Sequence, residues 1–236
     1  MIGVIYSLLE AADATPYCEL LHWREGIRAR RWTGGSKIAD AYDLTSFPLL
    51  LSRLQEDWVA NGRHWTNAGF HAIAVYRFGV WARHQKGLAG RIVTLLYRVL
   101  NAFVRNLYSI ELPHRATIGH RPWFPHPAGI VISQLAEVGD DCMIRQNVTI
   151  GRVTRGRKRT PPYAPKLGNG VEVGAGAVII GGITIGDGAR IGPNAVVMTD
   201  VPPGGTAFAS PAKVMEPLRK TKAKDADVAV TEPGDL

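Results

Sequence analysis

The side chains in this sequence best suited to proton transfer are histidines, and all seven lie at or before His126. An imidazole titrates near neutral pH, so it can take the proton of a hydroxyl group that attacks an acyl donor. Such a transfer also needs donors for the developing oxyanion and a groove for the acyl carrier. His126 is the last of the seven, and it lies inside a repeat of apolar residues that runs from Ile118 to Val197.

The element that must position this histidine is a repeat with a period of six residues. Six apolar residues stand six apart near the end of the chain: Leu167, Val173, Ile179, Ile185, Ile191 and Val197. Four of them are followed directly by glycine. Neither the helical period of 3.6 nor the strand period of two keeps this register, whereas a triangular coil with one hexad per side does. We therefore predict a three-sided β-solenoid whose aliphatic residues point inward.

The same register extends upstream, with one slip of two residues, through Ile118, Phe124, Ile132, Val138, Ile144 and Ile150. Between Ile150 and Leu167 the step is 17 residues, which is one hexad plus 11 extra residues. The repeat stops at Val201-Pro202-Pro203-Gly204. We predict four to five coils with a loop extruded at about residues 152–166.

Upstream of the coils the apolar residues follow a helical period, and three helices are expected: 47–58 with an end near Asn61, 67–84, and 90–108. Arg91, Arg98 and Arg105 lie seven apart along the third helix, which argues against a membrane span. As a basic amphipathic helix it can lie on a membrane surface or pack against neighbours in an oligomer, and packing is favoured. Residues 1–45 give no firm signal beyond short amphipathic helices. The predicted organisation is a helical domain over 1–110, a β-helix over 111–205, and a C-terminal extension with a flexible tail over 206–236.

Composition limits the partners of this protein. The chain has 236 residues and a formal net charge of +8, which favours anionic partners. Nucleic acid is not expected, because no recognition motif is present. Cys18 and Cys142 lie in different regions without metal-ligand spacing, and no basic leader precedes Glu10. These features predict a cytoplasmic protein without a metal site.

Several segments together resemble the bacterial serine acetyltransferases, a branch of the hexapeptide acyltransferases. The similarity covers about residues 46–217 and rests on 69–72 (Gly-Phe-His-Ala), 76–77, Trp81, 118–119, His126 with 129–132 (Gly-Ile-Val-Ile), 173–177, 200–204 and 210–213 (Ser-Pro-Ala-Lys). The resemblance implies an α+β fold, in which an N-terminal helical domain is followed by a left-handed parallel β-helix of hexapeptide repeats with an extruded loop. A cleft between the chains of a homotrimer, or of a dimer of trimers, is then expected.

The resemblance also assigns roles to individual residues. His126 matches the catalytic histidine of the family, and Glu111 stands where the family has an aspartate that orients it. Acetyl-CoA is expected as co-substrate in a groove between neighbouring β-helices. Its arm would run along small residues, and a lysine would reach its phosphates; the matching positions are Gly151, Ala175, Pro193 and Lys213. His114 and His120 are expected to be solvated.

The chain departs from the family where the acceptor should bind. Ala164 replaces a second active-site histidine, Tyr163 replaces an arginine that helps to hold the serine carboxylate, and Pro125 replaces an aspartate before the catalytic histidine. Two groups that would recognise the charged ends of an amino acid are thus missing from the predicted substrate-binding positions Tyr163 and Ala164. Losing them removes charge-assisted contacts worth several kcal/mol in acceptor binding.

The sequence therefore predicts an O-acetyltransferase and leaves two acceptors open. One is L-serine, which would give O-acetylserine for cysteine biosynthesis. The other is a sugar hydroxyl in exopolysaccharide or surface polysaccharide assembly. A zinc enzyme on the same solenoid would need histidines on successive coils, and the main coils contain none. A sugar nucleotidyltransferase would need a Gly-rich nucleotide-binding segment, which is missing ahead of the coils. A purely structural solenoid is the remaining alternative, and it would make His126 dispensable.

Overall fold

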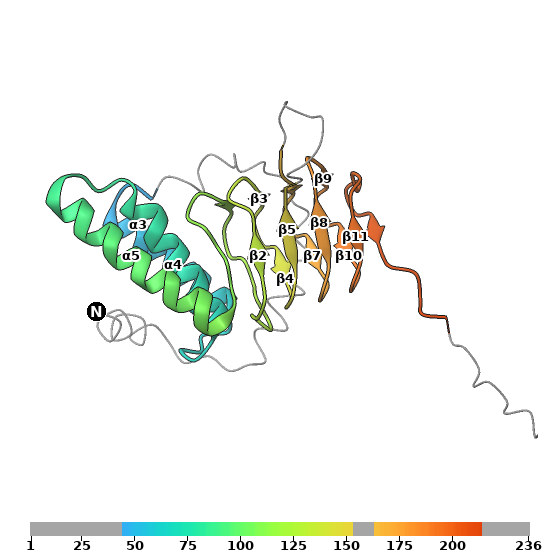
Figure 1. The fold of residues 1–236 in the computed structure, drawn as a ribbon, viewed down its shortest axis with the longest axis horizontal. Coiled ribbons are helices and arrows are strands. Elements are labelled where there is room, and N and C mark those ends of the chain that lie inside the picture. Colours follow the sequence, from blue (N-terminus) through green and yellow to red (C-terminus); the bar gives the residue numbers. More distant parts are fainter. Residues whose placement is uncertain (1–43, 153–162, 214–236) are drawn as a thin grey trace, which may run out of the picture.

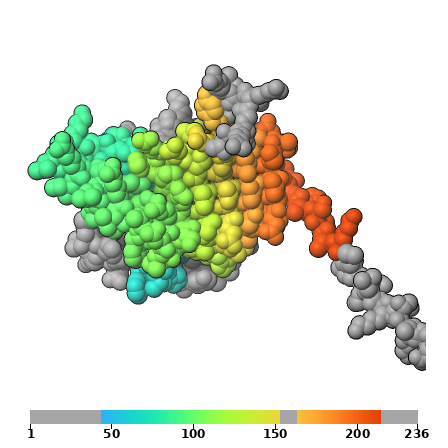
Figure 2. Space-filling model, viewed as in Figure 1, coloured from blue at the N-terminus to red at the C-terminus, as the bar shows by residue number. Residues whose placement is uncertain are grey.

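The computed structural model describes residues 44–152 and 163–213. The expectations for residues 1–43, for most of the extruded loop and for the tail beyond 213 lie outside the described residues. Within them, three helices stand together at one end of a stack of short strands, and the strands follow one another away from the helices in sequence order (Figure 1). In the space-filling view the helices and coils form one continuous elongated body (Figure 2).

The three expected helices are present: α3 (Phe47–Ala60), α4 (Ala68–Ala82) and α5 (Gly87–Tyr108). The side chain of Ser46 accepts from the amide of Leu49 at the start of α3, and Asn61 is its C-cap. The side chain of Asn67 accepts from two amides in the first turn of α4. These caps satisfy amides and carbonyls that a helix end leaves unpaired, so the sequence signals for these boundaries had a direct physical cause.

In the described residues the coils contain twelve strands, each of two or three residues: β1 (Thr117–Ile118), β2 (Val131–Ile132), β3 (Glu137–Val138), β4 (Met143–Ile144), β5 (Thr149–Gly151), β6 (Lys166–Leu167), β7 (Glu172–Val173), β8 (Val178–Ile180), β9 (Thr184–Ile185), β10 (Arg190–Ile191), β11 (Val196–Val197) and β12 (Thr206–Ala207). They form three parallel sheets, in the orders β1-β3-β6-β9, β2-β5-β8-β11 and β4-β7-β10-β12. Isolated bridges at Glu111, Trp123 and Val201 complete the first and last coils. Twelve strands and three bridges make fifteen sides, which is five coils of three sides.

The aliphatic hexad positions line the interior of the prism, as their period predicts. All six residues from Leu167 to Val197 are buried, and so are the six upstream positions, including Phe124. Glycine is required where neighbouring coils touch at a corner. Gly176 has a φ of +70°, and a Cβ atom there would lie 2.2 Å from Oδ1 of Asn194 on the next coil. The predicted three-sided β-helix after a helical part is confirmed.

Side-chain oxygens join successive coils at another corner. Oδ1 of Asp140 accepts from the amide of His120, Oδ1 of Asn169 accepts from the amide of Asp140, and Oδ1 of Asp187 accepts from the amide of Asn169, all at 2.7–2.8 Å. Each contact joins one coil to the next. The prism is therefore stabilised mainly by contacts between nearest neighbours, as in other repeat proteins.

Helix side chains bind the backbone of the first coil. The guanidinium of Arg77 donates to the carbonyls of Ile118 at 2.8 Å and Gly119 at 2.5 Å. The Tyr76 hydroxyl donates to the carbonyl of Ala116 at 2.8 Å. The Asn61 amide donates to the carbonyl of Pro122 at 2.9 Å, and its oxygen accepts from the amide of Phe124. These contacts take up polar backbone groups that the first coil would otherwise leave buried and unpaired.

Candidate active site

His126 lies at a corner of the prism, between the bridge at Trp123 and strand β2. The same corner on later coils carries Ala175 and Pro193. Backbone bonds align the column: the amide of Asn147 donates to the carbonyl of Ala128, that of Gly176 to Gln146, and that of Asn194 to Ala175. Coils stack about 4.8 Å apart, so Ala175 lies about 10 Å and Pro193 about 15 Å along the column from His126. The structure thus brings three predicted site residues to one edge of the molecule.

The environment of His126 suits a group that meets a ligand from outside the chain. Its side chain is exposed, as are Ala128 and Pro193 on the same corner, while Phe124 before it and Ile130 after it are buried in the core. Buried anchors on both sides hold the backbone of this corner in place. The imidazole therefore stands on a fixed edge and faces outward.

Glu111 lies one coil before β2, in register with Val131. Its amide donates to the carbonyl of Ile130 at 2.8 Å, and its carbonyl accepts from the amide of Ile132. Its side chain is exposed and lines a pocket with Arg105. Within the described part of the chain no hydrogen bond joins the Glu111 carboxylate to the His126 imidazole. The orienting role of Glu111 stays a prediction.

The remaining donor-side residues lie elsewhere. Gly151 is the last residue of β5 and pairs with Ile180. It therefore lies at the carboxyl end of the strands in the sheet β2-β5-β8-β11, whereas Ala175 lies before their amino ends. Lys213 is exposed beyond β12 and is the last described residue. The structure does not bring either of them to the corner column. An acetyl-CoA molecule that touched all the predicted residues would have to extend across one sheet, along the direction of its strands.

The predicted acceptor residues have opposite surroundings. The Tyr163 side chain is 45% exposed, whereas Ala164 is 2% exposed and belongs to the hydrophobic core. Tyr163 can therefore offer its ring to a ligand directly. A larger side chain at Ala164 would have to displace packed neighbours.

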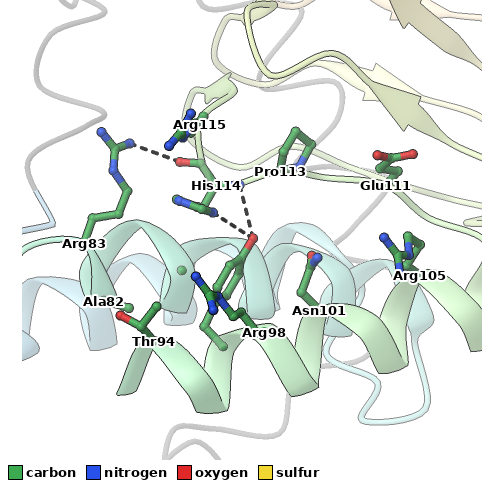
Figure 3. Close-up of a pocket in the computed structure, with 12 residues that line it drawn as sticks. Ala82, Arg83, Thr94, Arg98, Asn101, Arg105, Glu111, Pro113, His114 and Arg115 are labelled. Atoms are coloured by element: carbon green, nitrogen blue, oxygen red, sulfur yellow. Dashed lines mark hydrogen bonds between the residues drawn. The ribbon is translucent and has the colours of Figure 1, made fainter. Parts of the chain in front are cut away.

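A pocket that no sequence pattern predicted lies between the helices and the first coil. It is lined mainly by polar and cationic residues, among them Arg83, Arg98, Arg105, His114 and Arg115 (Figure 3). Nδ1 of His114 lies 2.9 Å from the hydroxyl of Tyr97 on α5, and Arg83 donates to the carbonyl of His114 at 3.2 Å. Burial, together with the positive charges of Arg83 and Arg115, lowers the pKa of His114. The pocket lies apart from the corner column and does not include His126.

The expectation that His114 and His120 are solvated was wrong. His114 is partly buried against Tyr97. His120 contacts Arg53 and lies 2.9 Å from a carboxylate oxygen of Glu56. Both histidines follow hexad positions at coil corners, where the sequence alone suggests solvent. The helices that cover the first coil make the difference.

The lowered pKa of His114 predicts a contribution to acid sensitivity. In the unfolded chain a histidine binds a proton near pH 6.5, but in the folded chain His114 binds it only at lower pH. Neutral His114 therefore contributes stability that is fully present above the ordinary pKa of histidine. This contribution is lost as the pH falls from there through the lowered pKa of the folded state. We expect His114→Asn, which keeps a polar partner for Tyr97, to lose less thermal stability than the parent chain between about pH 7.5 and about pH 5.5. Thermal melts at both pH values test this, with His84→Asn, an exposed histidine, as control. Identical pH dependence in His114→Asn and the parent would contradict it.

Metal ligands do not cluster in the described part of the chain: among these residues no group of three or more His, Cys, Asp or Glu side chains gathers. Cys142 is buried, and burial raises the pKa of its thiol to about 12. It therefore stays protonated at neutral pH and is no candidate nucleophile.

Comparison with known proteins gives a consistent result. The bacterial transferase hexapeptide (six repeats) model matches residues 164–198. A serine acetyltransferase of Helicobacter pylori is 37% identical over 166 residues, which cover 69% of this chain and 91% of that protein. A probable serine acetyltransferase of rice is 36% identical over 149 residues, which cover 62% of this chain and 46% of that protein. The chain thus spans about half the length of some of the curated relatives that it matches.

Solved structures are also similar. Soybean serine acetyltransferase complexed with serine has a TM-score of 0.55 at 31% identity, covering 71% of this chain and 70% of that one. A serine acetyltransferase in complex with CoA has a TM-score of 0.55 at 30% identity, covering 75% of this chain and 73% of that one.

Proposed function

Because the chain belongs to the serine acetyltransferase family, we propose that it transfers the acetyl group of acetyl-CoA to the hydroxyl of L-serine. The fold is that of the family: an N-terminal helical part followed by a left-handed parallel β-helix. The single observation that carries the proposal is His126, exposed at the head of a corner column that also holds Ala175 and Pro193. The product would be O-acetylserine, a precursor for cysteine synthesis.

The proposed reaction needs one base and no covalent enzyme intermediate. His126 takes the proton of the serine hydroxyl while the oxygen attacks the thioester carbonyl. The tetrahedral intermediate collapses, the carbon–sulfur bond breaks, and the CoA thiolate leaves. The imidazolium of His126 returns the proton to the thiolate, so that CoA and the acetyl ester are released. Glu111 is proposed to orient and stabilise the imidazolium.

The donor is proposed to lie along the corner column, with Ala175 and Pro193 beneath its arm. Gly151, at the far end of the strands of that sheet, and Lys213, beyond β12, are proposed to contact parts of the carrier that extend past the column. Ala175 has no side chain beyond Cβ, so a carrier can lie close to the backbone there. Since every residue of the column comes from one edge of a prism, a second wall is needed to enclose the carrier. We propose that a neighbouring chain of a homotrimer, alone or in a dimer of trimers, supplies that wall, and that the protein works in the cytoplasm.

The acceptor is tested by the release of thiol from acetyl-CoA in the presence of serine, homoserine or a panel of sugars. We expect serine to support turnover, because the named relatives are serine acetyltransferases. The comparisons do not favour the sugar alternative. Turnover with a sugar and none with serine would reject the proposed acceptor while leaving acetyl transfer in place. No turnover with any alcohol would reject the enzyme class.

A single substitution tests whether the acceptor pocket has been weakened. Tyr163→Arg places a cation where the family holds the serine carboxylate, at an exposed position that tolerates a long side chain. We expect KM for serine to fall by about tenfold, which corresponds to one charge-assisted hydrogen bond. Steady-state kinetics with serine measures this, and Tyr163→Gln is the matched uncharged control. The double variant with Ala164→His carries an added packing cost of about 1–3 kcal/mol because Ala164 is buried. An unchanged KM in Tyr163→Arg would mean that the serine carboxylate binds elsewhere.

A further inference from the structure

Helix α5 presents a long apolar stripe to the surroundings. Six apolar side chains on it are 57–73% exposed: Leu88, Ile92, Leu95, Val99, Phe103 and Leu107. Steps of three and four residues separate them, so they form one stripe along a helix of 22 residues, or about 33 Å. The stripe faces away from Gly90, Tyr97 and Val104, which are the buried residues of α5. In Figure 2 the green atoms of α5 lie at the surface of the molecule.

Arginines border this stripe on one flank. At 100° per residue, Arg91, Arg98 and Arg105 fall in a second row beside the apolar stripe, and Arg98 and Arg105 also line the pocket of Figure 3. All three are exposed, and α5 contains neither aspartate nor glutamate. In the described ranges 44–152 and 163–213 no ion pair reaches them. Arg83 and Arg115 line the same pocket, and their charge helps to lower the pKa of His114.

An apolar stripe beside a basic row is the pattern of a helix that lies in the surface of an anionic bilayer. The apolar side chains enter the boundary of the acyl chains, and the arginines reach lipid phosphates at the edge. By length and composition α5 is also able to cross a membrane. Crossing would expose its buried face to lipid and separate Tyr97 from His114. Lying on the surface uses only the outward face and leaves these contacts in place.

The charge pattern distinguishes the membrane from a second copy of α5. Two copies that paired through the stripe would each bring a row of three arginines and no acidic residue on the helix to neutralise them. Like charges at such a seam oppose association. An anionic lipid surface complements both the stripe and the row.

We propose that the outward face of α5 docks this protein on an anionic lipid bilayer, with the stripe inserted and the row of Arg91, Arg98 and Arg105 on lipid phosphates. This surface is separate from the corner column, so docking does not depend on the identity of the acceptor. It places the helical end of the molecule against the membrane and leaves the last coils away from it.

The test is flotation of the full chain with two kinds of vesicle: phosphatidylcholine mixed with phosphatidylglycerol, and phosphatidylcholine alone. We expect binding to the mixed vesicles that weakens as salt is raised. Ile92→Ser/Val99→Ser/Phe103→Ser should weaken it by about 100-fold or more, because three inserted side chains are lost. Arg91→Gln/Arg98→Gln/Arg105→Gln should weaken it by about fivefold per arginine, on the order of 100-fold in all, on the mixed vesicles alone.

Matched controls change equal surface elsewhere. Val196→Ser/Met198→Ser/Phe208→Ser removes three apolar side chains that are 60–75% exposed on the last coils. Arg145→Gln/Arg152→Gln/Arg190→Gln removes three exposed cations in the coil part of the chain. Both control variants should float like the parent chain. Circular dichroism shows whether each variant has kept its fold.

Three results would overturn the proposal. The first is that the full chain does not float with anionic vesicles, which would follow if another segment of the chain covers the stripe. The coil controls lose as much binding as the α5 variants, which would mean non-specific adsorption. Without lipid, the apolar α5 variant has a smaller assembly mass than the parent in size-exclusion chromatography with light scattering, which would make the stripe an interface between copies. Acetyl transfer is assayed in the same samples without vesicles, so failure of docking is distinguishable from failure of the proposed reaction.

Discussion

His126→Ala loses at least about 100-fold in turnover of acetyl-CoA with serine, and the loss approaches about 10⁴-fold if proton transfer limits the rate. The substitution removes the only imidazole of the corner column described above, and no other histidine follows it in the sequence. Water would have to replace it as base, and water is a much weaker one. Release of thiol from acetyl-CoA in the steady state measures the effect.

The folded state should not change in this variant, because the His126 side chain is exposed and its removal leaves no cavity. A thermal midpoint equal to that of the parent verifies this. His84→Ala, another exposed histidine, is the control and should retain full turnover. If His126→Ala turns over serine like the parent, another group is the base and the corner column is not the active site.

Arg77→Met is expected to reduce the free energy of unfolding by about 3–5 kcal/mol. Arg77 and Asp57 are both buried, and two guanidinium nitrogens contact the carboxylate at 2.8 and 3.3 Å. Burial opposes the charge of Arg77, but attraction to Asp57 outweighs it and raises the pKa of the guanidinium. Without Arg77 the Asp57 carboxylate is left buried and unpaired. The carbonyls of Ile118 and Gly119 also lose their donor.

Denaturant unfolding measures this loss. Arg145→Met, which removes an exposed arginine, should stay within about 0.5 kcal/mol of the parent. Asp57→Leu/Arg77→Met should be more stable than Arg77→Met alone, since no charge is then left unpaired in the core. A double variant no more stable than the single one would assign the cost to the first coil's carbonyls rather than to Asp57.

The period of six residues was enough to predict the prism. Each of Leu167, Val173 and Ile179 is buried at its expected side, because a three-sided coil admits only one inward position per hexad. The three helices were also predictable from local signals, and Asn61 caps α3 as expected. Both results depend on interactions between residues close in the sequence or repeated along it.

Contacts between distant parts of the chain could not be predicted in this way. His120 looked like a solvent-exposed corner, but Glu56 on α3 reaches it from 64 residues away. The pocket around His114 requires α5 to lie beside the first coil, which no local pattern reveals. In the candidate site, the column of His126, Ala175 and Pro193 follows from the coil register. The relation of Glu111 to His126 depends on side-chain orientations that the register does not fix.

The helices that cover the first coil limit polymerisation. Backbone groups of this coil already bind the side chains of Arg77, Tyr76 and Asn61. Parallel strands with a free edge can act as a template for another chain, and a filament needs a free edge at both ends of every subunit. Here the helices close one end of the coils. When the last coils of two chains pair through β11 or β12, the other end of each chain is covered by its helices, so no third chain can add. Removing residues 44–108 would open that end, and the truncated coils would then be free to grow into fibres.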